Sequence, residues 1–140
     1  MPWTHVREDL QEAIAVMRQE LLDKLYYNRA KIIRVIDADT MEMDIDLGHG
    51  VWLKHSKKSP VRIRLARIDA WEVRGEERER GMQAKERVKE LFENLGGDVL
   101  IKTISKDSFG RWIADVWLGD GKNLSDLLLL EGHAELYKGS

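Results

Sequence analysis

The sequence predicts a small α+β domain with five strands, one helix between the third and fourth strands, and a short helix near the end. Two observations lead to this fold class. Short runs that are β-branched or alternate between apolar and polar residues recur from residue 31 onward, as expected for strands. A charged helical stretch that ends at a glycine pair separates the first three runs from the last two.

The first 25 residues contain a separate amphipathic helix. Between residues 4 and 25, apolar side chains recur at spacings of three and four, with polar residues between them: Val6, Leu10, Ile14, Met17, Leu21 and Leu25. Burying each one contributes about 1.5–3 kcal/mol before the loss of entropy, so this apolar stripe should pack on something. We expect it to pack on its own domain, in a monomer, and a dimer through this helix is the alternative. Residues 1–28 are thus an extension to a domain of residues 29–140.

Two strands follow, joined by a tight turn. Residues 31–36 are rich in β-branched residues and residues 41–47 alternate strictly, so the turn lies at Asp37-Ala-Asp-Thr40. The second strand carries three acids on its polar face, which we expect to be a solvated surface rather than a metal cluster: Glu42, Asp44 and Asp46.

The remaining elements complete a barrel. They are expected in this order: a possible sheet extension at 51–54, a strand at 61–65, a helix ending near residue 95, strands at 98–104 and 111–118, and a short helix at 124–130. A helix inserted after the third of five strands is typical of the oligonucleotide-binding (OB) barrel. We therefore predict an OB fold.

Composition excludes several classes of protein. The 140 residues suffice for one domain that buries a core without disulfides. The absence of cysteine excludes disulfides, thiolate zinc sites and cysteine nucleophiles. No stretch approaches the roughly 18 apolar residues of a membrane span, and the first residues lack the apolar run of a secretory signal. We expect a cytoplasmic protein without a membrane partner, although a secreted chain whose signal had been removed would have the same pattern.

Charge is distributed unevenly along the chain. The net charge of −2 and a pI near 6.1 give no overall attraction to nucleic acid. Residues 54–68, however, hold six basic residues and no acid, whereas residues 37–46 hold five acids and no base. Neighbouring strands of opposite charge would suit a cation and a phosphate that meet at one edge. For the lysines alone, a solvated turn is the simpler interpretation.

Three polar segments each follow a predicted strand and carry complementary groups. Asp39 and Asp69 could bind a hard cation through oxygen, with Asp37 orienting a bound water. Arg64 and Arg111 could grip a phosphate, and a carboxylate at Glu72 could take a proton from water; the segments are 37–40, 64–72 and 107–111. Taken singly, each residue is explained equally well by a turn or a surface ion pair. The combination, in this order, indicates phosphodiester chemistry.

Residues from about 30 to 137 resemble the staphylococcal nuclease (thermonuclease) family. That family has a strand, Asp-Gly-Asp-Thr, then Arg-x-x-x-x-Asp-x-Pro-Glu, a helix and Asp-x-x-Gly-Arg. The spacing from Arg64 through Asp69 to Glu72 matches this pattern without gaps. The resemblance implies a calcium-dependent, sugar-nonspecific nuclease on an OB barrel, which cuts single-stranded or frayed DNA and RNA and leaves 3′-phosphate ends.

The resemblance also implies a role for each matching residue. Ca²⁺ would be bound by Asp39, Asp69 and the backbone carbonyl of Ala70. Asp37 would not contact the ion directly but would orient a bound water. Glu72 would act as general base, while Arg64 and Arg111 would neutralise the phosphate as charge develops. The positions expected to bind substrate are Trp71, Ser108, Phe109 and Lys138.

Five positions depart from the family pattern, of which Ala70 should be harmless if only its backbone carbonyl is used. Ala38 stands where glycine is usual, which matters if the turn needs a positive φ. Trp71 replaces proline, so the backbone before Glu72 is expected to be less restricted. Ser108 and Phe109 replace a lysine and a tyrosine that can contact phosphate, which predicts weaker substrate binding. The alternative function is a non-catalytic nucleic-acid-binding OB module or an interaction adaptor, but such a module has no need of Glu72.

Overall fold

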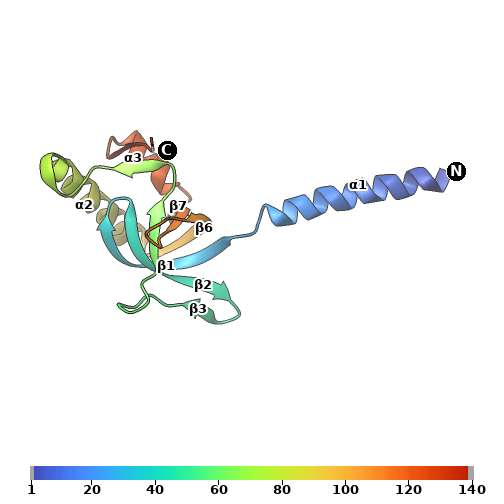
Figure 1. Cartoon of the computed structure of the whole chain (residues 1–140), viewed down its shortest axis with the longest axis horizontal. Helices are drawn as coiled ribbons and strands as arrows, with labels where there is room; N and C mark the ends of the chain where they lie inside the picture. Colours follow the sequence, from blue (N-terminus) through green and yellow to red (C-terminus); the bar gives the residue numbers. More distant parts are fainter. Residues whose placement is uncertain (1, 139–140) are drawn as a thin grey trace.

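A closed five-stranded barrel forms the centre of the molecule. The computed structural model describes residues 2–138, with side chains from residue 6 onward. The barrel strands, in spatial order, are β1 (Tyr27–Asp37), β2 (Thr40–Gly48), β4 (Arg62–Leu65), β7 (Trp112–Trp117) and β6 (Asp98–Lys106), which pairs again with β1. Strands β4 and β7 run parallel, and the other barrel pairs are antiparallel. The predicted α+β, OB-like barrel is confirmed (Figure 1).

Side chains that alternate along the strands fill the barrel. Met41, Met43 and Ile63 are fully buried, as expected for the inward positions of β2 and β4. Two helices pack on this core, α2 (Arg78–Leu95), which follows the short 3₁₀ helix η1 (Gly75–Glu77), and α3 (Leu124–Leu130). Helix α2 ends directly before Gly96, whose φ of +86° needs glycine, so the predicted helix end is confirmed.

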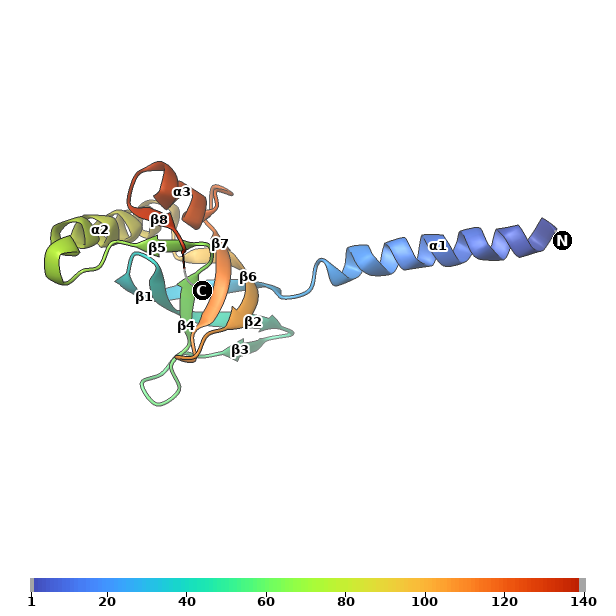
Figure 2. The same cartoon turned by 45° about the horizontal axis from the view of Figure 1, so that its top comes forward.

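A second, two-stranded sheet ties the end of the chain to the barrel. Strand β5 (Ile68–Ala70) pairs antiparallel with β8 (Ala134–Leu136), beside α3 (Figure 2). The pairing continues with the Tyr137 N–H, which donates to the carbonyl of Arg67 at 2.8 Å. The sequence pattern did not predict these strands, because three residues are too few to display a period. A short strand β3 (Val51–Leu53) extends β2 outside the barrel.

The amino-terminal helix extends away from the barrel. Helix α1 (Pro2–Leu22) projects from the start of β1 in both views (Figures 1 and 2). The six side chains of the apolar stripe, five on α1 and Leu25 in the turn after it, remain 47–65% exposed. The expectation that this stripe packs on its own domain is therefore wrong, because α2 and α3 are the helices that cover the barrel core. Among the described residues, no helix is both long and apolar enough to cross a membrane.

Removing residues 1–25 is expected to leave the stability of the barrel unchanged. Since the stripe remains largely exposed, the free energy of unfolding should change by less than about 0.5 kcal/mol. Thermal denaturation of the full chain and the truncated chain, at several protein concentrations, measures this. We expect both the full chain and the truncated chain to be monomers. A lower melting temperature at every concentration would mean that the helix packs on the domain, and one that depends on concentration would indicate self-association.

Two of the three acids on β2 are buried, contrary to the expected solvated surface, and the third, Asp46, is partly buried. Glu42 is 4% exposed and Asp44 is 8% exposed. Glu42 accepts hydrogen bonds from Arg34 on β1 and Arg62 on β4, and Asp44 accepts one from the backbone N–H of His55. The alternation in the sequence could not reveal this burial, because the covering groups come from other segments.

Candidate active site

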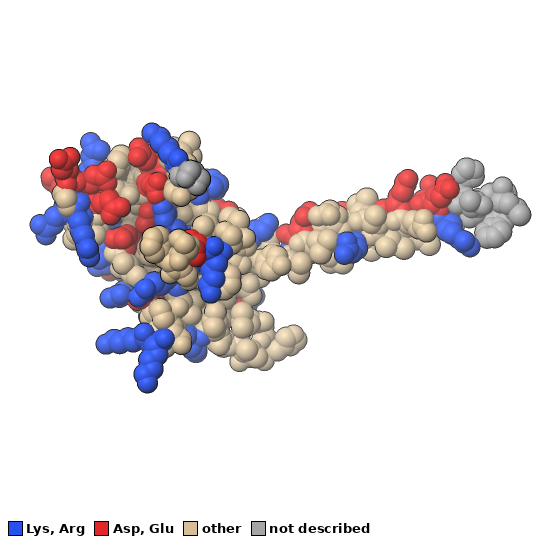
Figure 3. All heavy atoms as spheres, in the orientation of Figure 1, with Lys and Arg blue, Asp and Glu red and all other residues tan. Residues whose placement is uncertain are grey.

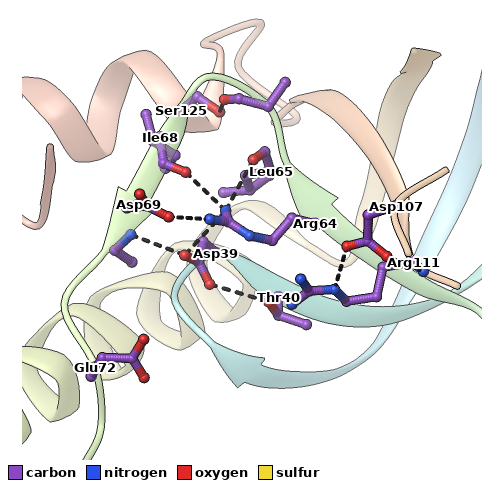
Figure 4. Close-up of polar contacts among 12 residues, drawn as sticks. Asp39, Thr40, Arg64, Leu65, Ile68, Asp69, Glu72, Asp107, Arg111 and Ser125 are labelled. Atoms are coloured by element: carbon purple, nitrogen blue, oxygen red, sulfur yellow. Dashed lines mark hydrogen bonds and ion pairs between the residues drawn. The ribbon is translucent and has the colours of Figure 1, made fainter. Parts of the chain in front are cut away.

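One open pocket contains all three polar segments. Its volume is about 490 Å³, and it lies where the β1–β2 turn meets the segments that follow β4, β5 and β6. The residues that line it are Asp37, Asp39, Thr40, Arg64, Leu65, Arg67, Ile68, Asp69, Glu72, Asp107, Ser108, Phe109, Arg111, Ile113 and Tyr137. Figure 4 shows the arginines and carboxylates of this pocket coming from different strands and loops.

Arg64 occupies the centre of the polar network. One terminal nitrogen, Nη1, donates to the carbonyls of Ile68 at 2.9 Å and Leu65 at 3.2 Å, and lies 3.1 Å from Oδ2 of Asp39. The other, Nη2, donates to Asp69. The side chain is only 13% exposed. The guanidinium group therefore lies between the two carboxylates in a fixed orientation (Figure 4).

Asp39 links the β1–β2 turn to β5. Its Oδ1 accepts from the Thr40 hydroxyl at 3.1 Å, and its Oδ2 accepts from the backbone N–H of Ala70 at 2.9 Å. Asp37 and Thr40 pair across the turn, so Ala38 and Asp39 form a two-residue loop. Ala38 is fully buried and does not have a positive φ, so alanine in place of the family's glycine causes no backbone strain here.

Negative charge converges at this turn. Burial raises the pKa of Asp37 above its usual value, and the neighbouring charge of Asp39 raises it further. Positive charges on Lys85, Arg74 and Arg111 act in the opposite direction but do not cancel the shift. The turn thus concentrates carboxylates that a cation would stabilise.

Arg111 is held in the pocket by the loop after β6. Its Nε donates to Oδ2 of Asp107 at 2.7 Å, while Oδ1 of Asp107 accepts the backbone N–H groups of Phe109 and Arg111, each at 2.9 Å. Burial alone would raise the pKa of Asp107, but these hydrogen bonds hold it below its usual value. The turn needs Gly110, whose φ is +80°. In Figure 4 this pair lies across the pocket from Asp69.

Glu72 presents a carboxylate without a partner. Its side chain is exposed and forms no hydrogen bond or ion pair with another residue in the described part of the chain. Its backbone, in contrast, is held on two sides. The N–H donates to Oε2 of Glu77 at 2.9 Å, and Gly81 of α2 packs so closely that an added Cβ would lie 2.0 Å from the Glu72 carbonyl oxygen.

The structure separates the four residues expected to bind substrate. Ser108 and Phe109 line the pocket, and the Phe109 ring is 81% exposed. Trp71 and Lys138 are not among the lining residues. The Trp71 indole N–H instead donates to the carbonyl of Gly132 at 2.9 Å.

The contacts of Trp71 replace the restriction that proline would impose. Besides the indole hydrogen bond, its backbone N–H lies 3.4 Å from the carbonyl of His133, and the guanidinium carbon of Arg80 lies 4.9 Å from its ring centre. The backbone before Glu72 is therefore held by tertiary contacts. The expected looseness is offset by interactions that the sequence motif does not contain.

Sequence reasoning missed Tyr137 as a pocket residue. The pairing of β8 with β5 brings Tyr137 to the pocket, where its ring centre lies 6.0 Å from the guanidinium carbon of Arg64. No local pattern near residue 137 signals this position. Arg67 also lines the pocket, but its guanidinium is bound to Asp115 and Asp126.

The oxygen donors at the pocket suit a hard cation. The carboxylates of Asp39 and Asp69 both contact the guanidinium of Arg64, so they converge on one positive group. Calcium and magnesium take such oxygen ligands together with carbonyls and water. Within residues 6–138, no group of three or more His, Asp or Glu side chains is placed to hold a metal by itself. A cation here would therefore complete its shell with backbone, water or substrate oxygens.

Comparison with known proteins agrees with the pocket. Residues 62–140, which include Arg64, Asp69, Glu72 and Arg111, match the family described as staphylococcal nuclease homologue. Two relatives named "Uncharacterized endonuclease", from Escherichia coli O157:H7 and Escherichia coli, are each 30% identical over 108 residues, which is 77% of this chain and 60% of theirs. "Protein ParB" of Escherichia coli is 29% identical over 118 residues, 79% of this chain and 58% of its own. The chain thus spans about three fifths of these relatives, and it belongs to the staphylococcal nuclease homologue family.

Proposed function

We propose that this chain is a calcium-dependent, sugar-nonspecific nuclease that hydrolyses phosphodiester bonds in single-stranded or frayed DNA and RNA and leaves 3′-phosphate ends. The observation that carries this proposal is that Asp39 and Asp69, Arg64 and Arg111, and the unpaired Glu72 carboxylate all line a single pocket. Family membership and the endonuclease names of two relatives support the same reaction class.

In the proposed reaction, Arg64 and Arg111 hold the phosphate from two sides and Glu72 activates water. The water oxygen forms a bond to phosphorus while Glu72 accepts the water proton. Negative charge grows on the phosphate oxygens, and two preorganised guanidinium groups stabilise it. The bond between phosphorus and the 5′ oxygen then breaks, the 5′ oxygen takes up a proton from solvent, and the phosphate stays on the 3′ side.

Asp39 and Asp69 would hold the Ca²⁺, with the backbone carbonyl of Ala70 as a further ligand. Ala70 lies next to Asp39, since its N–H donates to that carboxylate. Asp37 stands one residue before the two-residue loop and would orient a bound water. When bound, the cation would polarise the phosphate and lower the pKa of a bound water.

A non-catalytic nucleic-acid-binding module is the second candidate. The two arginines would suffice for phosphate binding. Glu72 argues against this candidate, because an exposed carboxylate that no described residue neutralises would repel the phosphate that a binding module must hold. The exposed stripe of α1 is compatible with an additional role as an interaction adaptor.

Digestion of end-labelled single-stranded DNA and RNA tests the proposal. Reactions with Ca²⁺, with Mg²⁺ and with chelator are compared, and the product ends are then analysed. We expect cleavage of both substrates in Ca²⁺, products with 3′-phosphate, and no cleavage in chelator. Cleavage that survives chelator, or products with 3′-hydroxyl ends, would contradict the proposed chemistry. Binding without any cleavage would support the second candidate.

Gly81→Ala is expected to lower turnover by displacing Glu72. A methyl group at this buried position of α2 would meet the Glu72 carbonyl oxygen at 2.0 Å, so the backbone that carries the general base must move. Overpacking of this kind typically costs about 1–3 kcal/mol of stability. Thermal melting and initial-rate assays measure the two effects, with the exposed Gln83→Ala on the same helix as control. Full turnover in Gly81→Ala would show that this contact does not position Glu72.

A further inference from the structure

We propose that a second phosphate-binding site lies beside the catalytic pocket and holds the backbone of a nucleic acid strand away from the bond that is cut. It consists of Arg34 on β1, Arg62 on β4 and the buried Glu42 that orients them. They line a separate pocket of about 380 Å³ together with Ile33, His55, Lys57 and Pro60. This inference rests on the proposed function for its ligand, nucleic acid, and for the position of the cleaved bond.

Glu42 orients both arginines by the same contact. Its side chain is 6% exposed, and each carboxylate oxygen accepts from a different arginine, Oε1 from Nε of Arg34 at 2.9 Å and Oε2 from Nε of Arg62 at 3.3 Å. Within the described residues, the terminal nitrogens of these arginines make no hydrogen bond. The side chains of Arg34 and Arg62 are 64% and 45% exposed. Each therefore keeps paired N–H donors available for phosphate oxygens.

The loop between β3 and β4 closes the other side of the site. Nε2 of His55 lies 3.4 Å from Oε1 of Glu42, and its Nδ1 accepts the backbone N–H of Val61 at 3.0 Å. The His55 N–H donates to Asp44 at 2.8 Å. These contacts fix the loop that carries Lys57. Figure 3 shows Lys and Arg side chains around this loop, at the lower edge of the barrel.

The positive charge at this site exceeds the charge that would neutralise Glu42. The lining holds three fixed positive charges, on Arg34, Lys57 and Arg62, and one negative charge, on Glu42. One guanidinium group would suffice to neutralise a buried carboxylate. Holding two of them on one carboxylate, with both side chains substantially exposed, leaves a net positive surface. Such a surface is complementary to a phosphodiester.

The β2–β4 ladder connects this site to the catalytic pocket. Thr40 pairs with Arg64, and Glu42 pairs with Arg62, two residues further along the same strands. Alternate residues of a strand share a face and lie about 7 Å apart, so the second site is one such step from Arg64. A strand whose scissile phosphate lies at Arg64 can therefore place another phosphate at Arg62 and Arg34. Contacts of this kind position the strand without reading its sequence.

Binding of oligonucleotides of two lengths tests the site. Fluorescence anisotropy in chelator measures the affinity for a dinucleotide and for a labelled oligothymidylate of about ten nucleotides, at several salt concentrations. We expect Arg34→Gln and Arg62→Gln each to weaken binding of the longer strand roughly three- to tenfold at low salt. Each should also reduce the slope of log K against log salt by about 0.7 per lost phosphate contact. The dinucleotide affinity should stay unchanged, and Arg34→Lys should restore part of the loss.

Arg29→Gln is the matched control, because Arg29 is exposed at the opposite end of β1 and undergoes the same change of charge.

Unchanged affinity and slope in the Arg34 and Arg62 variants, with a lowered melting temperature, would show that the cluster only stabilises Glu42. Equal losses for both oligonucleotides, or no binding by the unchanged protein, would also overturn the inference. Cleavage assays separate the two proposals: arginine-dependent binding without cleavage would refute the nuclease alone, and cleavage unaffected by these variants would refute the second site alone.

Discussion

Glu72→Gln is expected to lower the turnover number for single-stranded DNA by about 10²- to 10⁴-fold, the usual contribution of a general base. The amide keeps the shape of the side chain but cannot take the proton of the attacking water. Stability should change by less than about 0.5 kcal/mol, because the carboxylate is exposed and has no partner among the described residues. Initial rates at saturating substrate and Ca²⁺, together with thermal melting, measure both quantities.

Glu76→Gln is the control for Glu72→Gln. Glu76 is exposed four residues further along the chain and loses the same charge, but it does not line the pocket. Its turnover should match that of the unchanged protein. Equal losses in the two variants would indicate a general effect of charge, and full activity in Glu72→Gln would assign the base to another group.

Arg64→Gln is expected to lower both activity and stability. Loss of one preorganised charge costs about 10²–10³ in turnover. In addition, Arg64 holds Asp39, Asp69 and two carbonyl groups together while only 13% exposed. The Arg64–Asp39 pair is largely buried, and removing one partner of such a pair typically costs about 3–5 kcal/mol. The sequence motif suggested only a phosphate ligand at Arg64, whereas its contacts in the structure also give it a structural role.

Arg111→Gln provides the comparison that separates these two effects. Arg111 contacts Asp107 within its own loop and is 28% exposed, so its removal should reduce turnover without a comparable loss of stability. Denaturant unfolding and initial rates of both variants measure the difference. Unchanged stability in Arg64→Gln would contradict its contacts with the carboxylates, and full activity at reduced stability would make its role purely structural.

Much of the barrel could be predicted because its signals are local. Alternation along residues 41–47 and the glycine pair after residue 95 each act within a few residues of the chain, and the structure confirms the strand and the helix end. Three residues of the proposed site could also be recognised together in the sequence, because Arg64, Asp69 and Glu72 lie within one short segment. The spacing between these three residues belongs to that segment alone and does not depend on how the rest of the chain folds.

Long-range packing decided the features that could not be predicted. The stripe of α1 has the pattern of a buried face, yet it stays exposed because other helices cover the core. Glu42 occupies a polar position in the alternating pattern of β2, which is typical of a solvated side chain, yet it is buried under arginines from two other strands. Tyr137 reaches the pocket only through the β5–β8 pairing.

Local signals in the chain specify the α+β barrel and the residue types of the three polar segments, because hydrophobic period, turn residues and motif spacing act between near neighbours. Long-range packing brings these segments into one pocket, joins Asp39 to Asp69 through Arg64, and holds Trp71 away from the pocket. It also decided where the arginines around Glu42 lie. Such contacts join residues far apart in the chain, and their energies depend on burial that no local pattern contains.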